Sequence, residues 1–150
     1  MLQTLIATRG QFEAIKLLYR SEVEQEDKSM DNPSIMSHVS LGTNDFAKAK
    51  AFYSAVLSTI GAHIIMEHED AVCFGKKFPE FWVQAPIDGK PAVVANGVHF
   101  GFQANSKQEV HEFYNAALEH GAADDGEPGP REEYGEPYYG CFLRDLDGHK

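Results

Sequence analysis

The sequence contains the same unit twice. When the chain is shifted by 61 residues against itself, six of the 20 positions from 38 to 57 meet an identical residue. The matches are His38 with His99, Asn44 with Asn105, Phe52-Tyr53 with Phe113-Tyr114, Ala55 with Ala116 and Leu57 with Leu118. Each copy is typical of a strand that opens on a histidine, followed by a polar turn and a helix. Such a repeat predicts a fold assembled from two copies of one supersecondary unit.

The first copy, residues 37–88, predicts a β-α-β-β-β order. A short strand opens at His38, and Asn44-Asp45 supplies the N-cap of a helix that runs to about Leu57. Three short strands follow, separated by polar turns, at 62–67, 71–75 and 81–85.

The second copy, residues 97–150, predicts the same order with fewer strands. We expect a strand at 97–104 and a helix from the Ser106 cap to about His120, with Gly121 as its left-handed C-cap. The Gly-, Pro- and Glu-rich stretch 126–139 predicts a loop, and 138–143 predicts a strand before the turn Asp145-Leu146-Asp147-Gly148. The last strand of this copy is therefore expected to be missing.

Composition excludes several classes of function. The chain of 150 residues has a net charge of −10, and this acidity is spread along it, which argues against nucleic acid or an anionic membrane as a partner. No apolar run is long enough for a membrane span, and the N-terminus is not a convincing signal peptide, so we expect a cytoplasmic protein. Residues 1–36 predict a helical extension and linker ahead of the domain 37–150.

Three segments give this order a family resemblance. They are HVSLGTNDFAKAKAFYSAVL, NGVHFGFQA and YYGCFLRDLDGHK. Together they resemble the vicinal-oxygen-chelate superfamily, which includes glyoxalase I, bleomycin-resistance proteins, fosfomycin-resistance enzymes and extradiol dioxygenases. The resemblance implies an α+β fold in which two paired βαβββ modules form a curved mixed sheet around a cavity.

The resemblance also implies a divalent metal in that cavity, which would be zinc, nickel, manganese or iron. By position, His38 and His99 match the ligands on the first strand of each module. The family's final glutamate ligand would come just after Lys150, and near the fourth ligand of glyoxalase I this chain has Trp82 and Gln84, neither of which is a carboxylate. This departure favours members that use two histidines and one glutamate over a strict glyoxalase I.

The resemblance implies two alternative functions. One is a metal-dependent enzyme that chelates two neighbouring oxygens of a small substrate, as an isomerase or lyase, a thiol transferase or a dioxygenase. The other is a metal-free protein that sequesters a small molecule, as bleomycin-resistance proteins do. The candidate substrate-binding residues are Trp82 and Gln84, which we expect on the cavity floor, and Arg131, Tyr138 and Tyr139 on its rim, because an arginine among tyrosines suits an anionic or aromatic ligand. We expect a homodimer, and a third possibility is assembly with a partner that supplies the missing strand.

Overall fold

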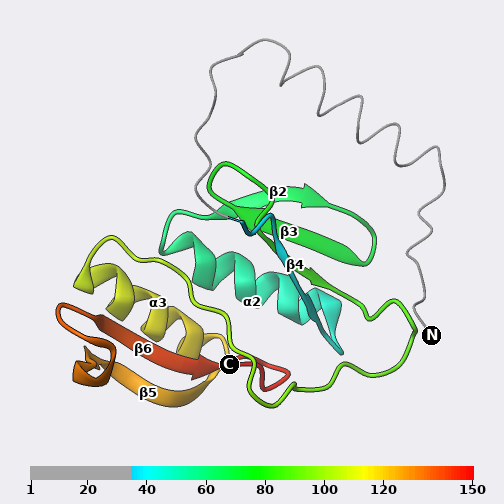
Figure 1. Ribbon diagram of the computed structural model, residues 1–150. Helices are drawn as coiled ribbons and strands as arrows, with labels where there is room; N and C mark the ends of the chain where they lie inside the picture. The colour runs from blue at the N-terminus through cyan, green and yellow to red at the C-terminus, as the bar shows by residue number, and fades with distance from the viewer. Residues whose placement is uncertain (1–34) are drawn as a thin grey trace, which may run out of the picture. The chain divides into compact units, whose positions relative to one another are not determined.

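The strands and helices of residues 35–150, which are the residues described by the computed structural model, follow the order β-α-β-β-β-α-β-β (Figure 1). The helical extension predicted for residues 1–36 lies almost wholly outside the described residues. By their contacts, residues Met36–Lys150 form one unit. Among the described residues, no helix has the length and apolar character needed to cross a bilayer.

The first module confirms the predicted βαβββ unit. Its elements are β1 (Val39–Gly42), α2 (Phe46–Ser58), β2 (His63–Glu67), β3 (Ala71–Gly75) and β4 (Phe81–Gln84). The strands form one mixed sheet in the order β1-β4-β3-β2, in which β1 and β4 are parallel and the other pairs antiparallel. Because β1 pairs with β4, the first strand of the module lies beside its last strand.

Side-chain caps explain where both helices begin. Asp45 caps α2, because its side chain accepts a hydrogen bond from the Lys48 N–H at 3.1 Å. Ser106 caps α3 (Lys107–Glu119) in the same way by accepting from the Glu109 N–H at 3.1 Å. Gly121 has a φ of 99°, as predicted for the residue that ends this helix.

The second module is only partly formed. After α3 come β5 (Ala123–Pro130), the short 3-10 helix η1 (Glu132–Tyr134) and β6 (Tyr139–Arg144). β5 and β6 make an antiparallel sheet of two strands. The turn at 145–148 is confirmed, since the Gly148 N–H donates to the Asp145 carbonyl at 3.0 Å.

Two predictions for this module were wrong. Residues 97–104 are not a strand, because in this structure they have no neighbouring strand to pair with. Residues 126–130 of the predicted loop 126–139 belong to β5, which holds two prolines and two glycines. Pairing with β6 outweighs their poor strand propensity, and β5 is an edge strand with two register shifts, where such residues are tolerated.

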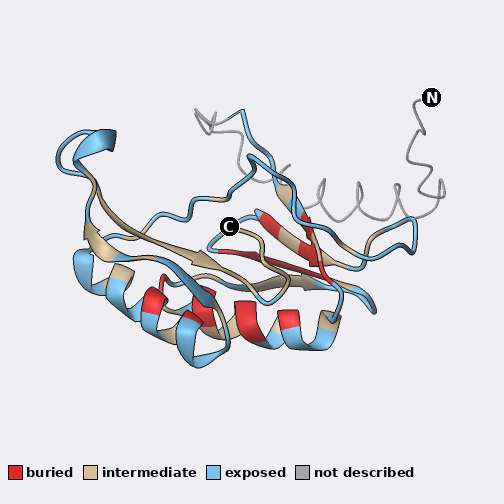
Figure 2. Cartoon of the chain, turned by 90° about the horizontal axis from the view of Figure 1, so that it is seen from below, coloured by how far each residue is buried: buried red, intermediate tan, exposed pale blue. Residues whose placement is uncertain are grey.

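The core lies between the two helices and the strands. Figure 2 shows the buried positions of α2 and α3 on the side that faces the sheets. On β4, Phe81 and Val83 are buried against α2, whereas Trp82 and Gln84 alternate to the opposite face. Each sheet therefore has one face covered by helix and one open face.

Candidate functional site

The open face of the second sheet carries the candidate site. On β6, Cys141 and Leu143 point to the helix side, since the Cys141 thiol lies 4.0 Å from the Val110 carbonyl and Leu143 packs against the core. Side chains alternate along a strand, so Phe142 and Arg144 point to the open face.

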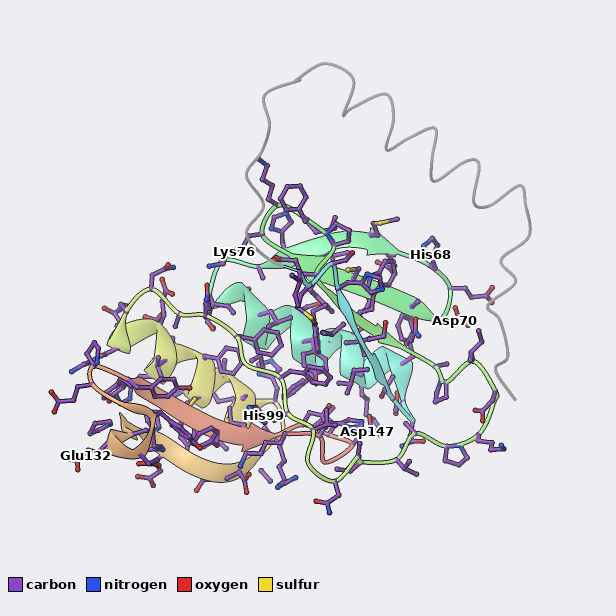
Figure 3. All side chains as sticks on the ribbon, viewed as in Figure 1. His68, Asp70, Lys76, His99, Glu132 and Asp147 are labelled. Atoms are coloured by element: carbon purple, nitrogen blue, oxygen red, sulfur yellow. The ribbon has the colours of Figure 1, made fainter. Side chains whose placement is uncertain are left out.

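A cavity of about 580 Å³ lies on this open face. Residues from β6, from η1 and from the segment before the second module's helix surround it: Val94, Ala95, Asn96, Gly97, Val98, His99, Tyr134, Tyr138, Phe142, Arg144 and Lys150. Figure 3 shows His99 beside the C-terminal end of β6, while Glu132 lies at the far end of the β5–β6 hairpin. Chain segments that are distant in sequence thus line an open space large enough for a small molecule.

Phe142 is the centre of an aromatic and cationic cluster. The Arg131 guanidinium lies 5.4 Å and the Lys150 ammonium 4.7 Å from the centroid of its ring. Tyr134 packs edge-on against Phe142 and against Tyr138, with centroid distances of 6.4 and 5.3 Å. Cations over an aromatic face are attracted by its negative potential, so the ring helps to hold the charges in place.

The charges of this cluster are only partly compensated. Asp125 bridges Arg144 at 3.3 Å and Lys150 at 3.0 Å, and its pKa lies below the ordinary value mainly because Lys150 donates to it. Arg131 donates only to the backbone carbonyls of Pro130 and Glu127, and no described carboxylate pairs with it. Of the three cations around Phe142, Arg144 and Lys150 therefore share the Asp125 carboxylate, while Arg131 has no carboxylate partner among the described residues.

A glycine makes room for this cluster. Gly126 pairs directly with Phe142 across the sheet and has a φ of 150°, where side chains are strained. A Cβ at this position would lie 3.1 Å from the Phe142 ring and 3.3 Å from an Arg131 nitrogen. The bulge at Gly126 therefore lets the guanidinium lie over the ring.

The structure brings together only some of the predicted site residues. His99 and Tyr138 line the cavity, and Arg131, which does not line it, lies over the ring of Phe142, which does. Tyr139 points to the helix side of β6, where its hydroxyl lies 2.8 Å from His111 Nε2 and its ring is covered by Lys107. Tyr139 is thus not placed to meet a ligand in this cavity.

The remaining predicted residues lie on or beside the first sheet. Trp82 and Gln84 point to its open face, where the Trp82 ring stacks on His68 at 6.0 Å with an interplanar angle of 7°. His38 is exposed just before β1, with its Nδ1 3.1 Å from the Ser37 hydroxyl. None of these three lines the cavity at His99.

The described residues do not supply a complete metal centre around the two predicted ligands. Within residues 35–150, the group of three metal-ligating side chains close enough to share an ion is Asp145, Asp147 and His149. A site with His38 and His99 would need at least one further ligand beside them. The two histidines therefore do not fit such a centre as they stand.

The Asp145, Asp147 and His149 group is already occupied by hydrogen bonds that hold the two modules together. Asp147 accepts from the Thr43 hydroxyl at 2.6 Å and from the Asn44 amide at 2.7 Å. Asp145 accepts from the buried Tyr53 hydroxyl at 2.7 Å, and His149 Nε2 lies 3.0 Å from the Gly42 carbonyl. We call this group, with its partners on β1 and α2, the clasp; Figure 3 shows Asp147 in its turn.

Several residues of the cavity wall were not predicted from the sequence. Phe142, Arg144 and Lys150 were not singled out, although the period of two in the predicted strand 138–143 places Tyr138 and Phe142 on one face. Extending that strand by one residue would have added Arg144. Asp125 carried no such signal, because its segment was not recognised as a strand.

The comparisons with known proteins agree with this fold. The family model described as Glyoxalase/Bleomycin resistance protein/Dioxygenase superfamily matches residues 35–150. This chain belongs to that superfamily. A search of curated proteins gave no significant match.

Several solved structures are similar to this chain. A glyoxalase/bleomycin resistance protein from Albidiferax ferrireducens T118 is 33% identical, with a TM-score of 0.71 over 77% of this chain and 93% of that one. A glyoxalase-related enzyme from Fulvimarina pelagi is 14% identical, with a TM-score of 0.57 over 76% of this chain and 82% of that one. A hypothetical protein from S. aureus is 20% identical, with a TM-score of 0.57 over 77% and 89%. The last two similarities concern the fold alone.

Proposed function

We propose that this superfamily member is a cytoplasmic protein that binds a small, flat, anionic molecule against Phe142 on the open face of β5 and β6. The observation that carries the proposal is the Arg131 guanidinium, held 5.4 Å over the Phe142 ring without a carboxylate partner among the described residues. An aromatic ring supplies area for stacking, and guanidinium N–H groups suit a carboxylate.

The neighbouring residues support this choice of ligand. Tyr134 and Tyr138 extend the aromatic wall, and Arg144 and Lys150 add positive charge that a single carboxylate, Asp125, does not cancel. A neutral ligand would leave this charge uncompensated, whereas an anion would complement it. The proposed role is therefore sequestration or binding, for which no metal is needed.

The test uses three probes of one shape and different charge. 1-Naphthoate, 1-naphthylmethanol and 1-naphthylmethylamine are titrated into the full chain and followed by calorimetry. We expect the anion to bind at least about tenfold more tightly than the neutral probe, since a hydrogen bond to a charged group contributes about 1.5–3 kcal/mol. Equal affinities for the three probes would contradict the proposal.

Arg131→Ala should remove the preference for the anion while leaving binding of 1-naphthylmethanol nearly unchanged. Lys90→Ala is the matched control, because Lys90 is an exposed cation outside the cavity that pairs only with Asp88. If Lys90→Ala weakened naphthoate binding as much as Arg131→Ala, the effect would come from net charge rather than from the site.

The second candidate is a metal-dependent enzyme that uses His38 and His99. Two observations favour it: both histidines are exposed, and they occupy equivalent positions of the repeat. The enzyme would need a further ligand that the described residues do not place beside them. Its test is the metal content of protein incubated with zinc, nickel, manganese or ferrous iron and then desalted.

One bound ion per chain, lost in both His38→Ala and His99→Ala, would support the enzyme. His120→Ala serves as the control, because His120 is also exposed and bonds only to the Ala116 carbonyl of its own helix. Unchanged metal binding in His99→Ala would end this candidate. The proposed homodimer is tested separately by gel filtration with light scattering.

A further inference from the structure

Asp125 is the extra residue of a β-bulge in the second sheet. Asp124 pairs with Leu143, and Gly126 pairs with Phe142, the next residue along β6, so Asp125 between them has no partner. A bulge turns the side chain of its extra residue out of the ordinary alternation of a strand. The Asp125 side chain is 27% exposed and lies beside two cations of the open face. The bulge thus delivers one carboxylate to the candidate site.

One oxygen of Asp125 holds two of the three cations around Phe142. Asp125 Oδ2 lies 3.3 Å from a terminal nitrogen of Arg144 and 3.0 Å from Lys150 Nζ. The other terminal nitrogen of Arg144 donates to the Gly148 carbonyl at 3.2 Å. Arg144 and Lys150 both line the cavity, so the cations that a ligand meets there already share a carboxylate of the protein itself.

Arg131 has no such partner among the described residues. Its terminal nitrogens donate to two backbone carbonyls, which carry no net charge. The first negative group of a ligand can therefore bind Arg131 without displacing a carboxylate. A second negative group would have to approach Arg144 or Lys150, where the Asp125 carboxylate repels it.

Building on the function proposed above, on which this inference rests, we propose that Asp125 restricts the site at Phe142 to aromatic ligands with a single negative charge. Carboxylates and sulfate esters belong to this class, and phosphate monoesters do not, because they carry nearly two charges above their second pKa of about 6. A like charge placed where a wrong ligand would lie is a general means of rejecting that ligand. Asp125 is therefore a specificity residue that acts through repulsion.

The experiment compares 1-naphthyl sulfate with 1-naphthyl phosphate by calorimetry on the full chain. The two esters have nearly the same shape, but at about pH 8 the phosphate carries close to two negative charges and the sulfate carries one. We expect the unaltered chain to bind the sulfate at least about threefold more tightly. In Asp125→Asn the phosphate should gain at least about tenfold in affinity and the sulfate less than about threefold.

Asp124→Asn is the matched control, because it removes the same charge one residue away. Asp124 is exposed, and its Oδ1 accepts from the Gly126 N–H at 2.8 Å, which the asparagine oxygen can also do. We expect this variant to leave the ratio of the two affinities within about twofold of that in the unaltered chain, since a solvent-exposed charge is screened by salt. Melting temperatures verify that both variants fold, as partly exposed ion pairs contribute little to stability.

Tighter binding of the phosphate than of the sulfate by the unaltered chain would overturn the proposed role of Asp125. An unchanged ratio in Asp125→Asn, or an equal change in Asp124→Asn, would also overturn it. These outcomes leave the proposed function intact when Arg131→Ala still weakens the binding of both esters. Binding of both esters no tighter than that of 1-naphthylmethanol, and unaffected by Arg131→Ala, would refute the proposed function and the role of Asp125 with it.

Discussion

Single side chains of this protein connect the two modules through buried hydrogen bonds. Tyr53, on α2, is 7% exposed, and its hydroxyl donates to Asp145 beyond β6. Burial, together with the negative charge of Asp145, raises the pKa of Tyr53 far above its ordinary value, so the phenol remains a donor at any physiological pH. The bond therefore links residues 92 positions apart.

Tyr53→Phe should destabilise the fold by about 1–2 kcal/mol, because the Asp145 oxygen loses its donor in a partly buried place. Urea unfolding followed by fluorescence measures the change. Tyr139→Phe is the control: it also removes a hydroxyl, but one that bonds exposed His111. An equal loss of unfolding free energy in Tyr139→Phe and Tyr53→Phe would show that burial of the Tyr53 hydrogen bond does not increase its contribution to stability.

At the scale of elements, the turn between β3 and β4 depends on a close approach of the backbone. A Cβ on Gly75 would lie 1.8 Å from the Phe78 carbonyl oxygen, a distance at which the turn must shift. The ladder on either side of the turn, with Phe74 opposite Phe81, carries core residues of the first sheet. The hairpin therefore requires glycine for space.

Gly75→Ala should cost about 2–3 kcal/mol, in the range of overpacked cores. Thermal unfolding gives the value. Gly101→Ala is the matched control, since no atom lies within 4 Å of its added Cβ and its φ is not positive, so we expect a change below about 0.5 kcal/mol. A melting temperature for Gly75→Ala close to that of the unaltered chain would refute the steric argument.

At the scale of the whole molecule, the clasp joins the end of the second module to β1 and α2 of the first. Partial burial raises the pKa of Asp147, but the hydrogen bonds from Thr43 and Asn44 together lower it by more. The pKa of Asp147 therefore lies below its ordinary value. A carboxyl whose pKa is lower in the folded state stabilises the fold when ionised. The clasp should therefore weaken in acid.

Stability should fall as the pH drops below the unfolded value of 3.8 and through the lower native pKa of Asp147. Asp147→Asn should be less stable than the unaltered chain at neutral pH and should show a shallower loss between about pH 5 and about pH 3, measured by urea unfolding. Asp88→Asn, in an exposed loop, controls for removal of one charge. Parallel acid profiles for Asp147→Asn and the unaltered chain would contradict this role.

The sequence by itself determined the two helices, their caps and the first sheet. These features depend on neighbouring residues: Asp45 and Ser106 cap within their own turn, and the alternation in β4 separates buried from open positions. The N-terminal helix, the metal ligands His38 and His99, and the homodimer stay predictions.

Only the tertiary structure decided that residues 97–104 do not form a strand, and which residues line the cavity. A segment becomes a strand when a partner pairs with it, and this segment has none, although it matches β1 in the repeat. The cluster around Phe142 joins Asp125 and Arg131, from a hairpin whose first strand was predicted in part as a loop, with Lys150, which follows that hairpin. Contacts across strands depend on register, which local patterns do not specify.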